Sequence, residues 1–264
     1  MFRDLPPITK NLLLINIICF LADAVFRRYG ISFSHLFGLH YLTAPDFYFW
    51  QPLTYMFMHA NFSHIFFNMF AVLMFAPALE ERWGGKRFLI YYLVTGLGAA
   101  VVQEVVWALQ LQPVLNSVDP VMASALANRV VTVGASGAVF GILLAFGWLF
   151  PDVRMFIMFI PIPIRARTLV IIYALIELFS GIAPTAGDNV AHFAHLGGMI
   201  FGWLLILWWR HRGYDGFDST PWNDGSFKRW MKEKWERLFP KRPPRINRDK
   251  DSKDYSDYHY HESL

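Results

Sequence analysis

The chain has little of what marks a soluble or secreted protein. It contains one cysteine, Cys19, in 264 residues, which excludes an intrachain disulfide. Only 17% of the residues are charged and 55% are hydrophobic, whereas ordinary soluble domains carry roughly 25% charged residues. Of the 24 Lys and Arg residues, 13 lie between Arg210 and Lys253. This segregation predicts an apolar membrane domain, residues 1–209, followed by a basic tail, residues 210–264.

Six apolar segments are candidates for membrane-spanning helices, each of which needs roughly 20 residues. They are residues 11–27, 62–79, 88–109, 135–151, 168–182 and 190–209. The first segment follows Arg3 and Lys10, as in a secretory signal, but five further segments follow it, so we interpret it as a retained span. The sequence therefore predicts an all-α membrane protein, a bundle of six helices.

The distribution of Lys and Arg predicts the orientation of this bundle. If both termini are cytoplasmic, 21 of the 24 basic residues lie on the cytoplasmic side. Only Arg27, Arg28 and Arg129 then lie outside. Because an excess of Lys and Arg marks cytoplasmic segments, we expect both termini to be cytoplasmic. The second, fourth and sixth spans then begin at the outer face.

Polar residues lie near the start of those three spans, where simple anchoring needs none. The second begins around His59, His64 and Asn68, the fourth at Ser136 and the sixth near His195. At ~1.5 Å rise per residue, Ser136, His64 and His195 are expected to share a depth of roughly 5–10 Å below the outer face. His59 is expected near the water boundary. Polar groups are costly inside a membrane unless they have a function, so the pattern predicts a functional cluster.

Ser136 and His195 have the chemistry of a nucleophile and its general base. Ser136 begins a helix, where free amides and the helix dipole favour a developing negative charge. His64 and Asn68 are one turn apart and can both donate to an oxyanion. The competing interpretations are structural: serine often permits close helix packing, and the His–Asn pair can bond between helices. Glycines on the fourth and sixth spans (Gly137, Gly141, Gly198 and Gly202) predict that these two helices approach closely.

Other chemistries have less support. His64, His192 and His195 offer three nitrogens for a metal, but no His-Glu-x-x-His motif occurs, so we expect no metal and no cofactor. Glu104 and Glu177 lie within spans at predicted depths that do not match the outer cluster well. Both are interpreted as structural or interfacial, so no acidic residue is expected as a third catalytic member. Ala138 replaces the second glycine of a Gly-x-Ser-x-Gly elbow, which does not support an α/β-hydrolase.

These motifs together resemble the rhomboid family of intramembrane serine proteases over roughly residues 10–209. Residues 134–137 (Gly-Ala-Ser-Gly) resemble the nucleophile motif, and residues 194–198 (Ala-His-Leu-Gly-Gly) resemble the motif of the catalytic histidine. His64 and Asn68 match the oxyanion pair, His59 an upstream histidine, and residues 80–84 the Glu-x-x-x-Gly turn. Phe140 stands where the family often has a tyrosine, and Trp50-Gln51 replaces a frequent Trp-Arg pair.

The resemblance implies a Ser136–His195 dyad that cleaves single-span or multi-span membrane proteins near the outer part of the bilayer. Gly134, Gly137 and Gly198 would support the site, and Phe140 would pack against the base. A bacterial plasma membrane is the expected location. Nucleic acid is not an expected partner, because no motif for it accompanies the basic charge. The alternatives are a catalytically inactive, client-binding relative, a transporter or channel, and a metal-dependent membrane hydrolase.

The basic tail contains one further pattern. Residues 227–239 place apolar side chains at helical spacing opposite basic ones, which predicts an amphipathic helix suited to an anionic membrane surface. Prolines at 240, 243 and 244 end this segment, and we expect residues 245–264 to be disordered.

Overall fold

A computed structural model describes residues 5–157, 160–183 and 191–214, together with Arg229, Lys232, Glu233 and Glu236 of the tail. It is mostly helical, as predicted. Each of the six predicted spans coincides with a helix, although several bounds differ by a few residues. These helices are α1 (Pro7–Phe26), α4 (Phe62–Trp83), α5 (Gly85–Leu115), α7 (Ser136–Leu149), α8 (Ala166–Ile182) and α9 (His192–His211).

Within the described residues, four segments are long and apolar enough to cross a membrane: Pro7–Tyr29, Phe62–Trp83, Gly85–Leu115 and His192–His211. Helix α7 has 14 residues and is a shorter apolar helix, and α8 has 17 residues. The chain is thus a multi-pass membrane protein. The count of six spans stays a prediction.

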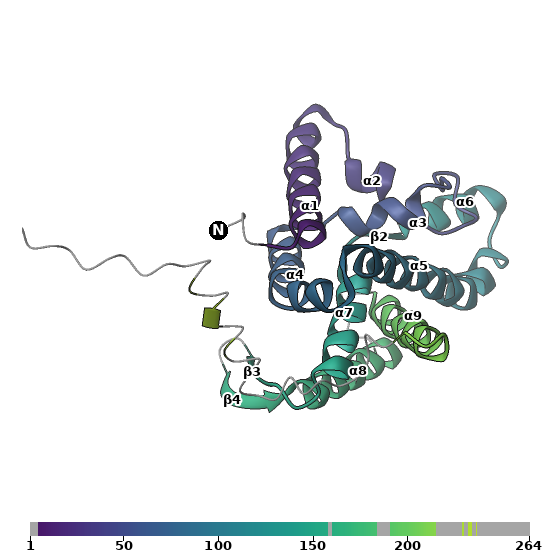
Figure 1. Ribbon diagram of the computed structural model, residues 1–264. Helices are drawn as coiled ribbons and strands as arrows, with labels where there is room; N and C mark the ends of the chain where they lie inside the picture. Colours follow the sequence, from purple (N-terminus) through teal and green to yellow (C-terminus); the bar gives the residue numbers. More distant parts are fainter. Residues whose placement is uncertain are drawn as a thin grey trace, which may run out of the picture.

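Helices α5, α7 and α9 form the centre of the bundle. Helix α9 packs mainly against α5 and α7, and α7 also packs against α5. Helix α1 lies against α4 at one edge, and α8 lies against α9 and α7 at another (Figure 1). Helix α7, which begins at Ser136, therefore has neighbours on most of its sides.

The structure also contains two small antiparallel sheets, which the all-α prediction did not include. Strand β1 (Leu39–His40) pairs with β2 (Val131–Thr132), and β3 (Arg154–Ile157) pairs with β4 (Ile160–Arg165). The first sheet joins the segment after α1 to the chain just before α7. The remaining short helices, α2 (Phe33–Phe37), α3 (Gln51–Thr54) and α6 (Pro120–Arg129), belong to the connections on either side of these strands.

The buried carboxylate of Glu80 joins the end of α4 to the start of α1. It accepts hydrogen bonds from the backbone amides of Ile8, at 2.9 Å, and Thr9, at 2.7 Å, and from the Thr9 hydroxyl, at 2.8 Å. The first amides of a helix have no acceptor within that helix, and the dipole favours a negative charge there. Gly84, with φ +79°, then ends α4, so that α5 begins immediately.

We expect Glu80→Ala to destabilise the bundle by about 1–3 kcal/mol, because buried donors of α1 would lose their acceptor. Thermal unfolding in detergent measures this effect as a lowered midpoint. Glu236→Gln, on an exposed residue of the tail, is the matched control. An unchanged midpoint in Glu80→Ala would contradict this role of the carboxylate.

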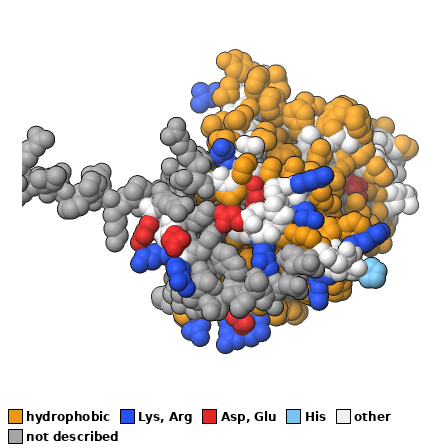
Figure 2. All heavy atoms as spheres, in the orientation of Figure 1, with side chains coloured by type: hydrophobic (Ala, Val, Ile, Leu, Met, Phe, Trp, Pro, Cys, Tyr) orange, Lys and Arg blue, Asp and Glu red, His pale blue; other side chains and the backbone are white. Residues whose placement is uncertain are grey.

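Large hydrophobic side chains are exposed along the outward faces of the helices. Examples are Ile18, Leu21, Phe62, Phe179 and Ile182, each more than half exposed. Figure 2 shows such side chains over a broad part of one face, at the end of the molecule that holds α1. A surface of this extent is typical of contact with lipid rather than water.

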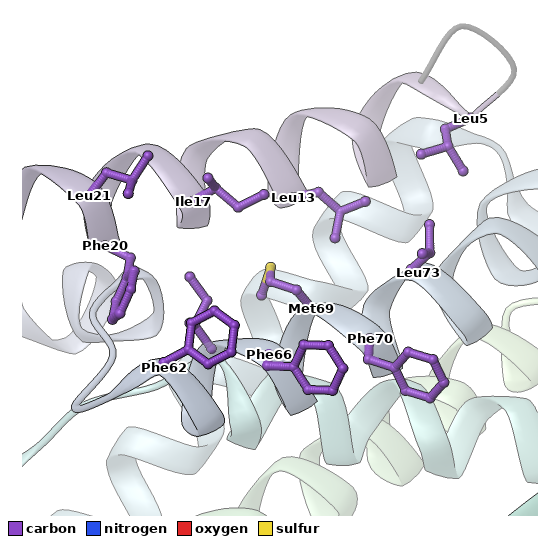
Figure 3. Close-up of a pocket in the computed structure, with 11 residues that line it drawn as sticks. Leu5, Leu13, Ile17, Phe20, Leu21, Phe62, Phe66, Met69, Phe70 and Leu73 are labelled. Atoms are coloured by element: carbon purple, nitrogen blue, oxygen red, sulfur yellow. The ribbon is translucent and has the colours of Figure 1, made fainter. Parts of the chain in front are cut away.

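An apolar cavity of about 420 Å³ lies between α1 and α4 (Figure 3). Its lining includes Leu13 and Phe20 of α1 and Phe66 and Met69 of α4. It offers no titratable side chain, so it has no group that can do chemistry. None of the predicted site residues lines it.

The predicted amphipathic helix at 227–239 lies largely outside the described residues. Its four described members, Arg229, Lys232, Glu233 and Glu236, are helical. Lys232 and Glu236 approach to 4.0 Å across one turn. The prediction for residues 245–264 falls wholly outside the described residues.

Candidate active site

Ser136 and His195 are joined by a hydrogen bond between two helices. Ser136 Oγ lies 2.7 Å from Nε2 of His195. Ser136 is the first residue of α7, and His195 lies in the first turn of α9 and is 8% exposed. This distance is within the range that a nucleophile and a general base need.

The ring of Phe140 fixes one face of the His195 imidazole. The two rings stack with centroids 4.4 Å apart and planes at 9°. Phe140 lies one turn after Ser136 on the same helix, so that α7 supplies both the hydroxyl and the packing surface. This contact is the one that the resemblance implies for residue 140.

Glu177 lies in contact with His195, contrary to the expectation that no carboxylate reaches this site. Its Oε2 is 2.8 Å from Nδ1 of His195 and 2.7 Å from Nδ1 of His192. Glu177 belongs to α8, and its side chain is buried. The predicted orientation of the spans contains a signal for this contact: residue 177 is five residues before residue 182, the predicted outer end of its span, and so roughly 7.5 Å below that end. That depth matches the predicted depth of His195.

His64 faces Ser136 across Gly134. A Cβ atom placed on Gly134 would lie 2.7 Å from His64 Nε2 and 3.5 Å from Ser136 Oγ. Gly134 has φ +132°, a conformation that favours glycine, and its amide donates to the carbonyl of Tyr55 at 2.9 Å. Glycine at this position therefore lets the His64 ring lie against the backbone two residues before Ser136.

Asn68 is buried one turn after His64, and its side chain is engaged within its own helix. Its Nδ2 donates to the His64 carbonyl at 2.9 Å. Because an amide nitrogen has two hydrogens, one remains for another acceptor. Asn61 caps the same helix by accepting from the His64 amide at 2.8 Å, which fixes the turn that carries His64.

His59 is 1% exposed, and its ring lies 5.1 Å from that of His64 in an edge contact. Neither ring nitrogen has a hydrogen-bond partner among the described residues. Burial, and secondarily the nearby His64, lowers the pKa of His59 to about 3 because both disfavour the imidazolium. His59 is therefore neutral at physiological pH and acts as a packing element under His64.

This lowered pKa predicts that acid destabilises the fold. Below the ordinary pKa of about 6.5 the unfolded chain binds a proton at His59, whereas the folded chain stays neutral until about pH 3. Stability therefore decreases as the pH falls through that window, by up to about 1.4 kcal/mol per pH unit. We expect His59→Phe to reduce the difference between the unfolding midpoints at pH 7.5 and 5.5. An unchanged difference would show that His59 does not contribute.

Close approach of α7 and α9 depends on one of the four predicted glycines, Gly198. A Cβ on Gly198 would overlap the carbonyl oxygen of Gly137, so the backbones of the two helices are in direct contact. A Cβ on Gly137 would instead overlap Ala99 of α5. The backbone contact at Gly198 lets the serine of α7 and the histidine of α9 lie within hydrogen-bonding distance.

The other two glycines face α5, which corrects the expectation that they join the fourth and sixth spans. A Cβ on Gly141 would lie 2.6 Å from Thr95 Cγ2, and one on Gly202 would overlap the Tyr91 hydroxyl. Tyr91 donates to the Gly141 carbonyl at 2.9 Å. The small residues thus pack α7 and α9 together onto a third helix, as well as onto each other.

The residues that could hold a metal ion in the structure differ from the three histidines that the sequence suggested. Glu177, His192 and His195 form the one group among the described residues whose ligand atoms lie within 4.8 Å of one another. Glu177 takes the place of His64 in this set. Both imidazoles direct Nδ1 to one carboxylate oxygen, which is the arrangement of a hydrogen-bonded cluster.

The other intramembrane carboxylate, Glu104, lies on α5 and accepts from the Leu42 amide at 3.0 Å. It thus holds the segment after α1 against α5, in agreement with its structural interpretation. Among the described residues, no hydrogen bond joins Glu104 to Ser136 or His195.

Residues 46–212 match the model of the rhomboid domain. The chain is 29% identical to "Rhomboid-like protein 11, chloroplastic" of Arabidopsis thaliana over 208 residues, which are 74% of this chain and 62% of that protein. It is 29% identical to "Putative rhomboid protease YdcA" of Bacillus subtilis over 160 residues, 59% of this chain and 65% of that protein. "Rhomboid protease GluP" of the same bacterium is 28% identical over 156 residues, 59% of this chain and 25% of that protein.

The matches span less than two thirds of the length of these relatives. The rhomboid model, however, covers more than half of this chain, from the connection after α1 to the end of α9. It includes the serine, the histidines and Asn68 of the candidate site. The chain therefore belongs to the rhomboid family.

Proposed function

We propose that the chain is an intramembrane serine endopeptidase that cleaves membrane-protein substrates within or near the outer part of the bilayer. The observation that carries this proposal is the 2.7 Å hydrogen bond between Ser136 Oγ and His195 Nε2. The names of bacterial relatives, "Putative rhomboid protease YdcA" and "Rhomboid protease GluP", also favour it. We infer six spans with both termini cytoplasmic, the first domain being residues 1–209.

In this proposal Ser136 attacks the scissile carbonyl while His195 accepts the hydroxyl proton at Nε2. The negative charge develops beside the N-terminus of α7, where the Ser136 amide can donate to it. His64 and Asn68 supply further donors from α4. His195 then gives its proton to the leaving amine, and a water molecule hydrolyses the acyl-enzyme.

The experiment that tests the function is cleavage of a single-span substrate by the purified chain in liposomes. We expect two products, whose appearance stops when a fluorophosphonate has labelled Ser136. Chelation with EDTA should leave the rate unchanged, because no step uses a metal. Loss of activity on chelation, with recovery on addition of zinc, would favour the metal-dependent alternative.

The main alternative is a catalytically inactive relative that binds membrane clients, since several relatives are named only rhomboid-like. Substrate binding without products in the liposome assay, and no reaction with fluorophosphonate, would favour it. The relatives include proteins named as chloroplastic and mitochondrial as well as Bacillus proteins. The bacterial plasma membrane therefore stays a prediction and has no support from these names.

A further inference from the structure

One buried carboxylate of α8 contacts the proposed base, and the proposed reaction gives it no role. Glu177 is 7% exposed, and its Oε2 lies 2.8 Å from Nδ1 of His195. On the other side of the same ring, Nε2 lies 2.7 Å from the Ser136 hydroxyl. The three side chains thus form one continuous series of hydrogen bonds across α8, α9 and α7.

This series determines which nitrogen of His195 carries the proton. A carboxylate only accepts hydrogen bonds, so Nδ1 must be the donor in the contact with Glu177. In the neutral ring Nε2 then has the lone pair and accepts from the Ser136 hydroxyl. That tautomer is the one that removes a proton from serine. The opposite tautomer would direct an N–H toward Ser136 and could not act as its base.

We propose that Glu177 is the positioning residue of the catalytic base, so that the site works as a Ser136–His195–Glu177 triad. The proposal rests on the proposed protease function. When His195 takes the proton from Ser136, the imidazolium forms 2.8 Å from a carboxylate oxygen, which stabilises the charge. Glu177 itself neither gains nor loses a proton.

His192 holds the carboxylate in place. Its Nδ1 lies 2.7 Å from the same Oε2 atom that contacts His195. A carboxylate oxygen has two lone pairs, so two N–H donors fix the orientation of this oxygen. Both histidines lie in the first turn of α9, three residues apart, so one helix turn presents both donors to α8.

The first test is Glu177→Gln, which keeps the shape of the side chain and removes the charge. We expect kcat to fall by about 10²- to 10⁴-fold with KM nearly unchanged, because the side chain acts on the base and not on the substrate. Glu104→Gln, on the other intramembrane carboxylate, is the matched control and should keep the wild-type kcat. His192→Ala should lower kcat by less than Glu177→Gln does.

A second measurement does not depend on any variant of Glu177 folding. In wild-type protein labelled with ¹⁵N-histidine, NMR at neutral pH should show His195 with its proton on Nδ1. The His195 resonance is identified by its loss in His195→Ala. A His195 ring protonated at Nε2 instead would overturn the proposal.

Failure of this proposal differs from failure of the proposed function. If wild type cleaves the substrate and Glu177→Gln keeps the wild-type kcat in a folded protein, Glu177 has no positioning role. If Glu177→Gln raises KM and leaves kcat intact, the residue shapes substrate binding and the triad is also wrong. If the wild-type protein itself neither cleaves nor reacts with fluorophosphonate, the protease function fails.

Discussion

Ser136→Ala is expected to reduce cleavage of a single-span substrate by at least about 10³-fold. The hydroxyl is the only nucleophile in contact with His195 among the described residues, at 2.7 Å. His195→Ala should cause a similar loss, because the hydroxyl is weakly nucleophilic without a base. The measurement is the initial rate in liposomes at saturating substrate.

Two features make this prediction specific to the dyad. The double variant should be no less active than either single variant, because residues that act as a unit show non-additive effects. Ser63→Ala, on an exposed serine in the first turn of α4, is the matched control and should retain activity. Substantial cleavage by folded Ser136→Ala would falsify the proposed nucleophile.

Gly198→Ala is also expected to have a large effect, although residue 198 takes no part in the chemistry. The added methyl group would overlap the Gly137 carbonyl, so that α9 must move away from α7. Overpacking of this kind destabilises by about 1–3 kcal/mol. Displacement of α9 also lengthens the Ser136–His195 contact, so we expect activity to fall more steeply than stability.

The comparison requires both the unfolding midpoint and the cleavage rate in the same detergent. Ser124→Ala, on an exposed residue of α6, is the control and should change neither quantity by much. Wild-type activity in Gly198→Ala would show that α7 and α9 have room to adjust.

The sequence was sufficient to predict that Ser136, His195 and His64 would meet. The hydrophobic runs locate the helices. The three residues lie at the starts of the second, fourth and sixth spans, which are all predicted to begin at the outer face, and this shared position predicts that they meet. Glu177 was missed because a carboxylate within a span was treated as too deep, whereas Glu177 lies only five residues before the end of α8 at Ile182 and contacts the first turn of α9. Depth along a span has to be counted from the correct end.

The partners of the glycines were predictable only in part. A small-xxx-small pair indicates that some helix approaches closely, but the spacing carries no information about which helix it is. The backbones of Gly137 and Gly198 contact each other, whereas Gly141 packs against Thr95 and Gly202 packs against Tyr91, both of α5. The two short sheets were also missed, since strands β1 and β2 have two residues each and form no periodic pattern.

The cap that Glu80 provides has a consequence for how the protein is made. The acceptor for the amides of Ile8 and Thr9 lies 71 or 72 residues later in the chain. During synthesis, α1 emerges long before this carboxylate exists, so its first amides lack this acceptor in the meantime. Helix α1 is therefore completed only after α4 has been synthesised and its far end has returned to the face where α1 begins.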